Sequence, residues 1–132
     1  MIVARAVDAF GRLDVAFKNA GVFVGLGPLA LGYSAHYTAC KHAILGYTRA
    51  AAVDYAQHNI RVNAISPGIT LTPMMEGFDP AAPENATLMA RMPAGRVATP
   101  EELVGTVVFM ASDMSPYMHG AAISVDGGWT AH

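Results

Sequence analysis

A long helical pattern followed directly by a strand is the feature that most restricts the fold of this chain. From Ser34 to about Gln57, small and apolar residues recur at helical spacing. The next segment, IRVNAIS at residues 60–66, is rich in β-branched residues and stops at Pro67-Gly68. Because helix and strand alternate in this way in βαβ units, the pattern predicts an α/β fold with a parallel sheet.

Further segments complete the predicted architecture. Residues 1–10 have apolar side chains at helical spacing and end at Gly11, which suits a helix C-terminus. Residues 13–18, within RLDVAFK, and AAISVD at residues 121–126 have the composition of short buried strands. We therefore expect one domain over residues 1–132. Its small sheet should have about three strands, at 13–18, 60–66 and 121–126, with helices at 34–57 and 99–112 packed on it.

The stretch before the last strand divides into a flap and a helix. The flap, residues 69–98, holds four prolines and four methionines with little periodicity, which indicates a mobile cover with one short helix. At residues 99–112 the pattern predicts a helix, because Thr99 and Glu102 form a capping box with proline at the first helical position.

Two rows of residues run along the predicted helix at 34–57. The first row is apolar, and its spacing predicts that it is buried: Cys40, Ile44, Tyr47, Ala51 and Tyr55. The second row consists of small residues, which would let the sheet or a partner helix approach closely: Ala39, Ala43, Gly46 and Ala50. Cys40, as a member of the first row, is expected to be an inert core thiol.

Composition excludes several classes of function. The net charge of -2 and the absence of a Lys or Arg cluster in the sequence predict no positively charged patch that would bind nucleic acid or an acidic membrane. No window approaches the ~20 apolar residues of a membrane span, and the N-terminus lacks the apolar run of a signal peptide. One cysteine cannot form an internal disulfide, and no histidine spacing suits a metal, so we expect a cytoplasmic protein without a metal site.

Tyr37 and Lys41 form the candidate catalytic pair. They are four residues apart in the predicted helix, which places them on one face and within reach of each other. Because a nearby ammonium favours tyrosinate, such a hydroxyl can act as an acid or a base near neutral pH. Spacing alone is weak evidence, however, and by itself favours a surface tyrosine and lysine without a role.

Several motifs in a fixed order favour the catalytic interpretation. YTACK is followed by IRVNAISPGITLTP, ATPEELVGTVVFMASD and AAISVDGGWTA, and FGRLDVAFKNAG precedes them all. Over almost the whole chain this series resembles the C-terminal half of the classical short-chain dehydrogenase/reductase family. The resemblance implies a truncated Rossmann-like fold and an NAD(P)-dependent oxidoreductase that interconverts a carbonyl and a secondary alcohol on a small molecule.

The resemblance also implies roles for individual residues. Tyr37 would donate or accept the proton of the carbonyl/alcohol pair, and Lys41 would assist it and hold the nicotinamide ribose of NAD or NADP. The remaining matched positions would lie along the cofactor: Asn19, Ala20 and Gly21 in the N-A-G turn, and Pro67, Gly68, Ile69 and Thr72 after the second strand.

The chain departs from the family pattern in two places. Nothing before residue 13 resembles the strand, glycine-rich turn and helix that bind the cofactor's pyrophosphate in the family. Only fifteen residues, 22–36, separate the N-A-G turn from Tyr37, too few for the family's intervening βα unit with its catalytic serine. Ser34 is expected to cap the helix rather than replace that serine, and GLGPLALG at 25–32 does not have the position of a nucleotide fingerprint.

Three hypotheses about function follow. The first is an oxidoreductase of reduced activity that uses Tyr37 and Lys41. The second is a non-catalytic remnant that acts as an oligomerising module, because the cofactor unit is missing and the small-residue row could pack against a second copy, giving a homo-oligomer. The third is a deletion product without a function of its own.

Overall fold

A computed structural model describes residue 5, residues 8–11 and residues 35–131. Its order of elements is α2 (Ala35–Tyr55), β1 (Ala64–Pro67), α3 (Ala86–Met89), α4 (Glu101–Ala111) and β2 (Ala122–Val125). Three short 3₁₀ helices lie between them, η1 (Ala56–His58), η2 (Pro73–Met75) and η3 (Pro83–Asn85). The predicted helices at 34–57 and 99–112 and the last two predicted strands are thus confirmed, with shorter bounds. The predicted strand at 13–18 lies outside the described residues.

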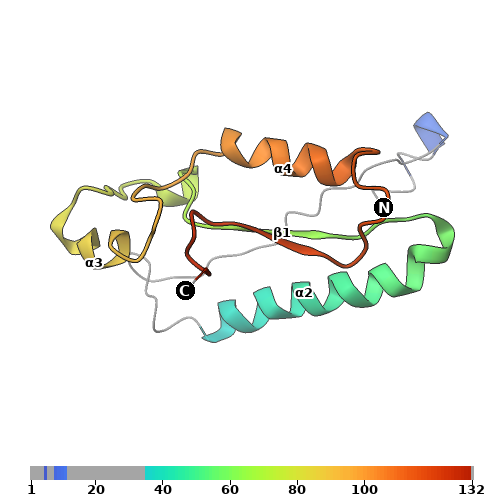
Figure 1. Cartoon of the computed structure of the whole chain (residues 1–132), viewed down its shortest axis with the longest axis horizontal. Helices are drawn as coiled ribbons and strands as arrows, with labels where there is room; N and C mark the ends of the chain where they lie inside the picture. The colour runs from blue at the N-terminus through green and yellow to red at the C-terminus, as the bar shows by residue number, and fades with distance from the viewer. Residues whose placement is uncertain (1–4, 6–7, 12–34, 132) are drawn as a thin grey trace.

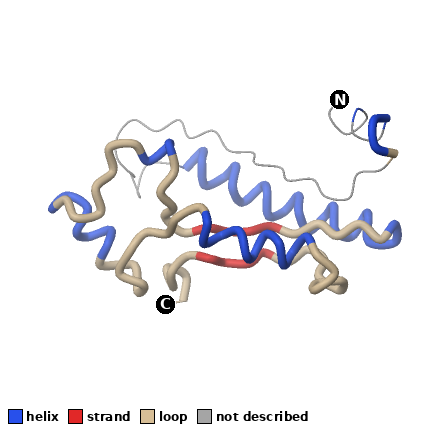
Figure 2. Tube along the Cα trace, turned by 90° about the horizontal axis from the view of Figure 1, so that it is seen from above, coloured by secondary structure: helices blue, strands red, loops and turns tan. Residues whose placement is uncertain are grey.

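The sheet is parallel, as the sequence predicts. β1 pairs with β2 in a register that joins Ala64 to Ala122 and Pro67 to Val125. Parallel strands require a long crossover connection, and here it contains the flap and α4. α4 lies on one side of the strands and α2 on the other, so the described part is a layered α/β fragment (Figure 1). The tube view from above agrees, with α4 in front of the strands and α2 behind them (Figure 2).

β1 begins later than predicted because side chains fix the residues that precede it. The amide of Asn63 donates to the carbonyl oxygen of Met118 at 2.9 Å and accepts from the N–H of Ala121 at 3.0 Å. Arg61 donates to the hydroxyl of Ser115 at 3.0 Å and to the carbonyl oxygen of Ser112 at 3.1 Å. These bonds replace part of the strand ladder and tie residues 61–63 to the loop before β2.

The buried face of α2 differs from the predicted one. Ala51 is buried, but Cys40, Tyr47 and Tyr55 of the predicted apolar row are exposed. The prediction of Cys40 as a core thiol is therefore wrong. The residues that α2 buries are Thr48, Ala51 and Ala52, and Thr48 tolerates burial because its hydroxyl donates to the carbonyl oxygen of Ile44 at 2.8 Å.

The N-terminus of α4 carries the predicted cap in a modified form. The carboxylate of Glu102 accepts from the N–H of Thr99 at 2.9 Å, while the N–H of Glu102 donates to the Thr99 carbonyl oxygen at 3.2 Å. Arg96 adds a two-pronged ion pair to the same carboxylate at 2.6 and 2.8 Å. The bonds from Arg96, then the bond from Thr99, lower the pKa of Glu102 to about 2.

The flap carries its own small core, which the sequence did not predict. Leu88, Met92 and Val97 are buried, and α3 is the one short helix expected there. The two ends of the flap also pair with each other, because Ala98 donates to the carbonyl oxygen of Ile69 and accepts from Leu71, both at 2.9 Å. Buried apolar side chains and a closed base hold the flap as a packed lobe rather than an open loop.

Two further observations complete the fold. Residues 8–10 are helical and Gly11 has φ 76°, as expected for a helix that ends there. Among the described helices, none is both long and apolar enough to cross a membrane.

Candidate functional site

Tyr37 and Lys41 lie near the start of α2. Both side chains are half-buried, and the Lys41 ammonium is 5.4 Å from the centroid of the Tyr37 ring. The helical period places them on the same face as Thr48 and Ala51, which are buried further along α2. The structure therefore brings the predicted pair together on the inner side of the helix. A hydroxyl and an ammonium placed in this way can bind an oxygen atom and exchange a proton with it.

The second group of predicted residues, 67–72, follows β1 at its carboxyl end. Pro67 is the last residue of the strand, and the N–H of Gly68 continues the ladder by donating to the carbonyl oxygen of Val125 at 2.9 Å. The hydroxyl of Thr70 donates back to the carbonyl oxygen of Gly68 at 3.1 Å. Thr72 is exposed at the start of η2, where its side chain makes no capping bond. Thr72 therefore lies exposed at the end of the sheet where ligands of open α/β folds bind.

Gly68 is fixed by a close approach of two backbones. A Cβ atom at this position would lie 2.7 Å from Cα of Asp126 and 2.9 Å from its carbonyl oxygen. Contacts that short do not occur between real Cβ atoms and backbone, so only glycine fits without movement of the chain. Residues 67–68 are thereby held against the turn that follows β2.

That glycine turn, residues 126–130, is organised by one carboxylate. Asp126 accepts from the N–H of Gly128 at 3.0 Å, from the N–H of Thr130 at 3.1 Å and from the Thr130 hydroxyl at 2.6 Å. The Thr130 hydroxyl is the main cause that lowers the pKa of Asp126, because a carboxylate accepting several hydrogen bonds favours its charged form. Gly127 and Gly128 adopt φ of 63° and 88°, which favour glycine.

The remaining predicted positions lie outside the described residues. They are Asn19, Ala20 and Gly21 of the N-A-G turn, together with Ser34 and the GLGPLALG stretch. Within the described part, no three His, Cys, Asp or Glu side chains come close enough to hold a metal ion.

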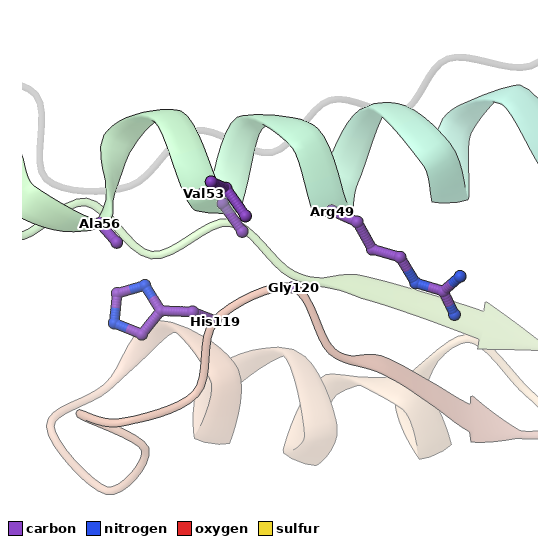
Figure 3. A pocket seen from close by; sticks show the side chains of 6 residues that line it. Arg49, Val53, Ala56, His119 and Gly120 are labelled. Carbon is purple, nitrogen blue, oxygen red and sulfur yellow. The ribbon is translucent and has the colours of Figure 1, made fainter.

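A shallow pocket lies between the C-terminal half of α2 and the loop before β2. Its lining consists of Arg49, Ala52, Val53, Ala56, His119 and Gly120. Nδ1 of His119 is buried there without a hydrogen-bond partner. The His119 ring lies below Ala56 whereas the Arg49 side chain extends the other way, so the two polar groups do not converge (Figure 3). Tyr37 and Lys41 are not among its lining residues, and the pocket is separate from the predicted pair.

The sequence analysis did not assign the residues of the glycine turn to the candidate site. The strand predicted at 121–126 is confirmed as β2, but no role was assigned to Asp126, Trp129 or Thr130. A signal was present, because Asp before two glycines is typical of a turn in which the carboxylate accepts backbone N–H bonds.

Comparisons with known proteins identify relatives of this chain. A family model described as enoyl-(acyl carrier protein) reductase matches residues 28–130. Cis-4-hydroxycyclohexanecarboxylate dehydrogenase of Sinomonas cyclohexanicum is 44% identical over 106 residues, which cover 80% of this chain and 42% of that protein. 2-Dehydro-3-deoxy-D-gluconate 5-dehydrogenase of Escherichia coli (strain K12) is 44% identical over 95 residues, covering 72% and 38%. The chain therefore spans about two fifths of the length of these relatives.

Solved structures give the same result. A protein of Agrobacterium tumefaciens assigned as a 2-deoxy-D-gluconate 3-dehydrogenase, with bound NADP, superposes with a TM-score of 0.69 at 42% identity. The match covers 73% of this chain and 39% of that one. A 4-hydroxyisoleucine dehydrogenase complexed with NADH gives a TM-score of 0.70 at 32% identity, covering 74% and 40%.

Proposed function

The chain belongs to the short-chain dehydrogenase/reductase family, and on that premise we propose that it takes part in the NAD(P)-dependent interconversion of a carbonyl and a secondary alcohol. The observation that carries this proposal is the pairing of Tyr37 and Lys41 on the inner face of α2, with the ammonium 5.4 Å from the ring centroid. Reduction of a carbonyl requires a group that gives a proton to the developing alkoxide. A tyrosine hydroxyl can act as that acid.

The described residues have the donor chemistry that a nicotinamide cofactor would require. The Lys41 ammonium is a hydrogen-bond donor suited to the ribose hydroxyls, and the exposed Thr72 hydroxyl can bond an amide or a phosphate. Pro67, Gly68 and Ile69 would face the nicotinamide, and Asn19, Ala20 and Gly21 would extend the site along the cofactor. When bound, the cofactor supplies or accepts the hydride.

Tyr37 performs the proton transfer in this proposal. In reduction its hydroxyl donates a proton to the substrate oxygen, and in oxidation its oxygen accepts the alcohol proton. Lys41 orients Tyr37 and stabilises the charge that develops on the hydroxyl oxygen. By their names, the two curated relatives described above act on a hydroxycyclohexanecarboxylate and on a dehydro-deoxy-gluconate. We propose a small hydroxy or keto carboxylate as the substrate of this chain.

Nucleotide titration tests the proposal. NADH and NADPH should each be added to the purified protein while nucleotide fluorescence is followed. We expect saturable binding of at least one of them, and an affinity at least about tenfold lower in Lys41→Met, because a charged hydrogen bond contributes about 1.5–3 kcal/mol. Arg49→Met, which removes the same charge outside the predicted site, serves as the control. Absence of binding up to millimolar nucleotide would refute the proposal.

A specific observation favours a second function, that of an oligomerising module. Every member of the small-residue row is exposed: Ala39, Ala43, Gly46 and Ala50. Beside this row Tyr47 is 64% exposed and Val53 79%. An exposed helix face with small residues at its centre allows a second helix to approach closely, and a two-fold axis would pair it with its own copy. We therefore propose a homodimer formed through α2. We also propose that the protein is cytoplasmic, because the exposed Cys40 would stay reduced in that compartment.

Sedimentation velocity tests this dimer. The wild-type protein should sediment as a dimer at micromolar concentration, and Ala43→Glu should shift it to the monomer, because two carboxylates would meet at the centre of the interface. Helix content by circular dichroism should stay unchanged, since Ala43 is exposed within one chain. A wild-type protein that sediments as a folded monomer contradicts the proposal.

A further inference from the structure

The second half of the flap is attached to the glycine turn by its backbone. The N–H of Ala94 donates to the carbonyl oxygen of Gly127 at 3.0 Å. A Cβ atom at Gly127 would lie 3.0 Å from Cβ of Ala94, and one at Gly128 would lie 3.1 Å from the Pro93 ring. The glycines therefore let the segment around residues 93–94 lie directly on the turn.

A side-chain contact reinforces this attachment. The Arg91 guanidinium lies over the ring of Trp129, 4.7 Å from its centroid, which is cation–π geometry. Arg91 is exposed and Trp129 is half-buried. The bonds of Asp126 to Gly128 and Thr130 fix the backbone on both sides of Trp129, so the ring is presented to Arg91 by a rigid turn.

This contact lies at the carboxyl ends of the strands, beside residues 67–68. The glycine turn directly follows β2, and Gly68 is pressed against Asp126. α3, which precedes Arg91 by two residues, lies beyond the strand ends (Figure 1). Residues 67–68, the glycine turn and the second half of the flap thus form one connected unit at the end of the sheet where the predicted site lies.

We propose that Arg91 and Trp129 form a latch that closes the flap on the glycine turn and so positions it for binding of the nicotinamide cofactor and its substrate. This role rests on the proposed function. Arg91 and Trp129 act here as positioning residues, through the backbone contact between Ala94 and Gly127. Because the flap also has a buried core of Leu88, Met92 and Val97, loss of the latch should release its attachment without unfolding it.

The experiment measures closure and binding separately. Amide hydrogen exchange of Ala94 reports on closure without nucleotide, and quenching of the fluorescence of Trp129, the only tryptophan in the chain, provides a second measure. In Arg91→Met the exchange of Ala94 should become about two- to fivefold faster, as expected for loss of an exposed cation–π contact. Arg91→Lys, which keeps the cation, should restore most of the protection, and Arg49→Met should leave it unchanged.

The affinity for NADH or NADPH, whichever the wild-type protein binds, is then measured in the same variants. In Arg91→Met the nucleotide affinity should fall, by no more than the factor by which the exchange of Ala94 becomes faster. In Arg91→Lys most of the affinity should return. Unchanged Ala94 exchange in Arg91→Met would show that no latch exists. Faster exchange with unchanged affinity would overturn the positioning role, because the site would then work with the latch released. If the wild-type protein binds neither NADH nor NADPH, the proposed function and the positioning role fail together, while the exchange rates still decide whether the latch exists.

Discussion

Replacing Gly68 by alanine is expected to destabilise the protein by about 1–3 kcal/mol, the usual cost of forcing an extra methyl group into a filled space. The added Cβ would meet three backbone atoms of Asp126 at 2.7 to 3.0 Å. Backbone cannot rotate away as a flexible side chain can, so β1 and the glycine turn would have to separate. The ladder bond from Gly68 to Val125 and the bonds around Asp126 would be disturbed together.

Gly105→Ala provides the matched control. Gly105 lies within α4, and a Cβ atom there meets nothing within 4 Å. The same chemical change should therefore stabilise the protein by about 0.5–1 kcal/mol, because alanine is the better helix former. Urea unfolding followed by circular dichroism measures both variants. A midpoint for Gly68→Ala equal to that of the wild-type protein would show that the backbone contact with Asp126 is not as close as described.

The effect of Gly68→Ala should be large in proportion to the total stability. Among the described residues, no large side chain is less than 2% exposed, and the buried apolar residues are only five: Ala51, Ala52, Leu88, Met92 and Val97. Small domains that bury few apolar side chains have a low free energy of unfolding, so the loss expected for Gly68→Ala is a large fraction of it. On α4, Val104 and Val108 are 54% and 57% exposed, so this helix adds little to the buried apolar surface.

Elements that depend on neighbours in sequence were predictable. The helix at 99–112 followed from Thr99, Pro100 and Glu102, whose bonds are local, and the structure confirms it as α4. The end of η1, which directly continues α2, is also set locally, because Asn59 adopts the left-handed conformation that stops it. Strand bounds were less predictable, since Asn63 and Arg61 bond to residues more than 50 positions away.

The orientation of α2 could not be predicted from periodicity. Apolar residues occur almost all around this helix, so the pattern does not select one face. Contacts made elsewhere select it, such as the approach of Gly120 to Ala52, where a Cβ atom added at Gly120 would lie 3.4 Å from Cβ of Ala52. Tyr37 and Lys41 were nevertheless placed on a common face, because that depends only on their spacing. The contact between Arg91 and Trp129 joins residues 38 positions apart and has no local signature.

Replacing Tyr37 by phenylalanine is expected to lower kcat by about 10²–10⁴-fold, the range for removal of a general acid or base. Turnover should be followed by nicotinamide absorbance with a panel of keto carboxylates and their alcohols. Because phenylalanine keeps the ring beneath the Lys41 ammonium, nucleotide affinity should change little. Lys41→Met should reduce both kcat and nucleotide affinity, because the proposed role of Lys41 includes a bond to the cofactor.

Tyr55→Phe is the control for this experiment. Tyr55 ends the same helix, is 48% exposed, and its ring lies 6.5 Å from that of His58, a contact that phenylalanine retains. Its loss of a hydroxyl should leave kcat unchanged. If Tyr37→Phe turned over substrate at the wild-type rate while Lys41→Met lost nucleotide binding, α2 would hold the cofactor but another group would transfer the proton. That result would separate binding from catalysis in a chain that spans about two fifths of the length of these relatives.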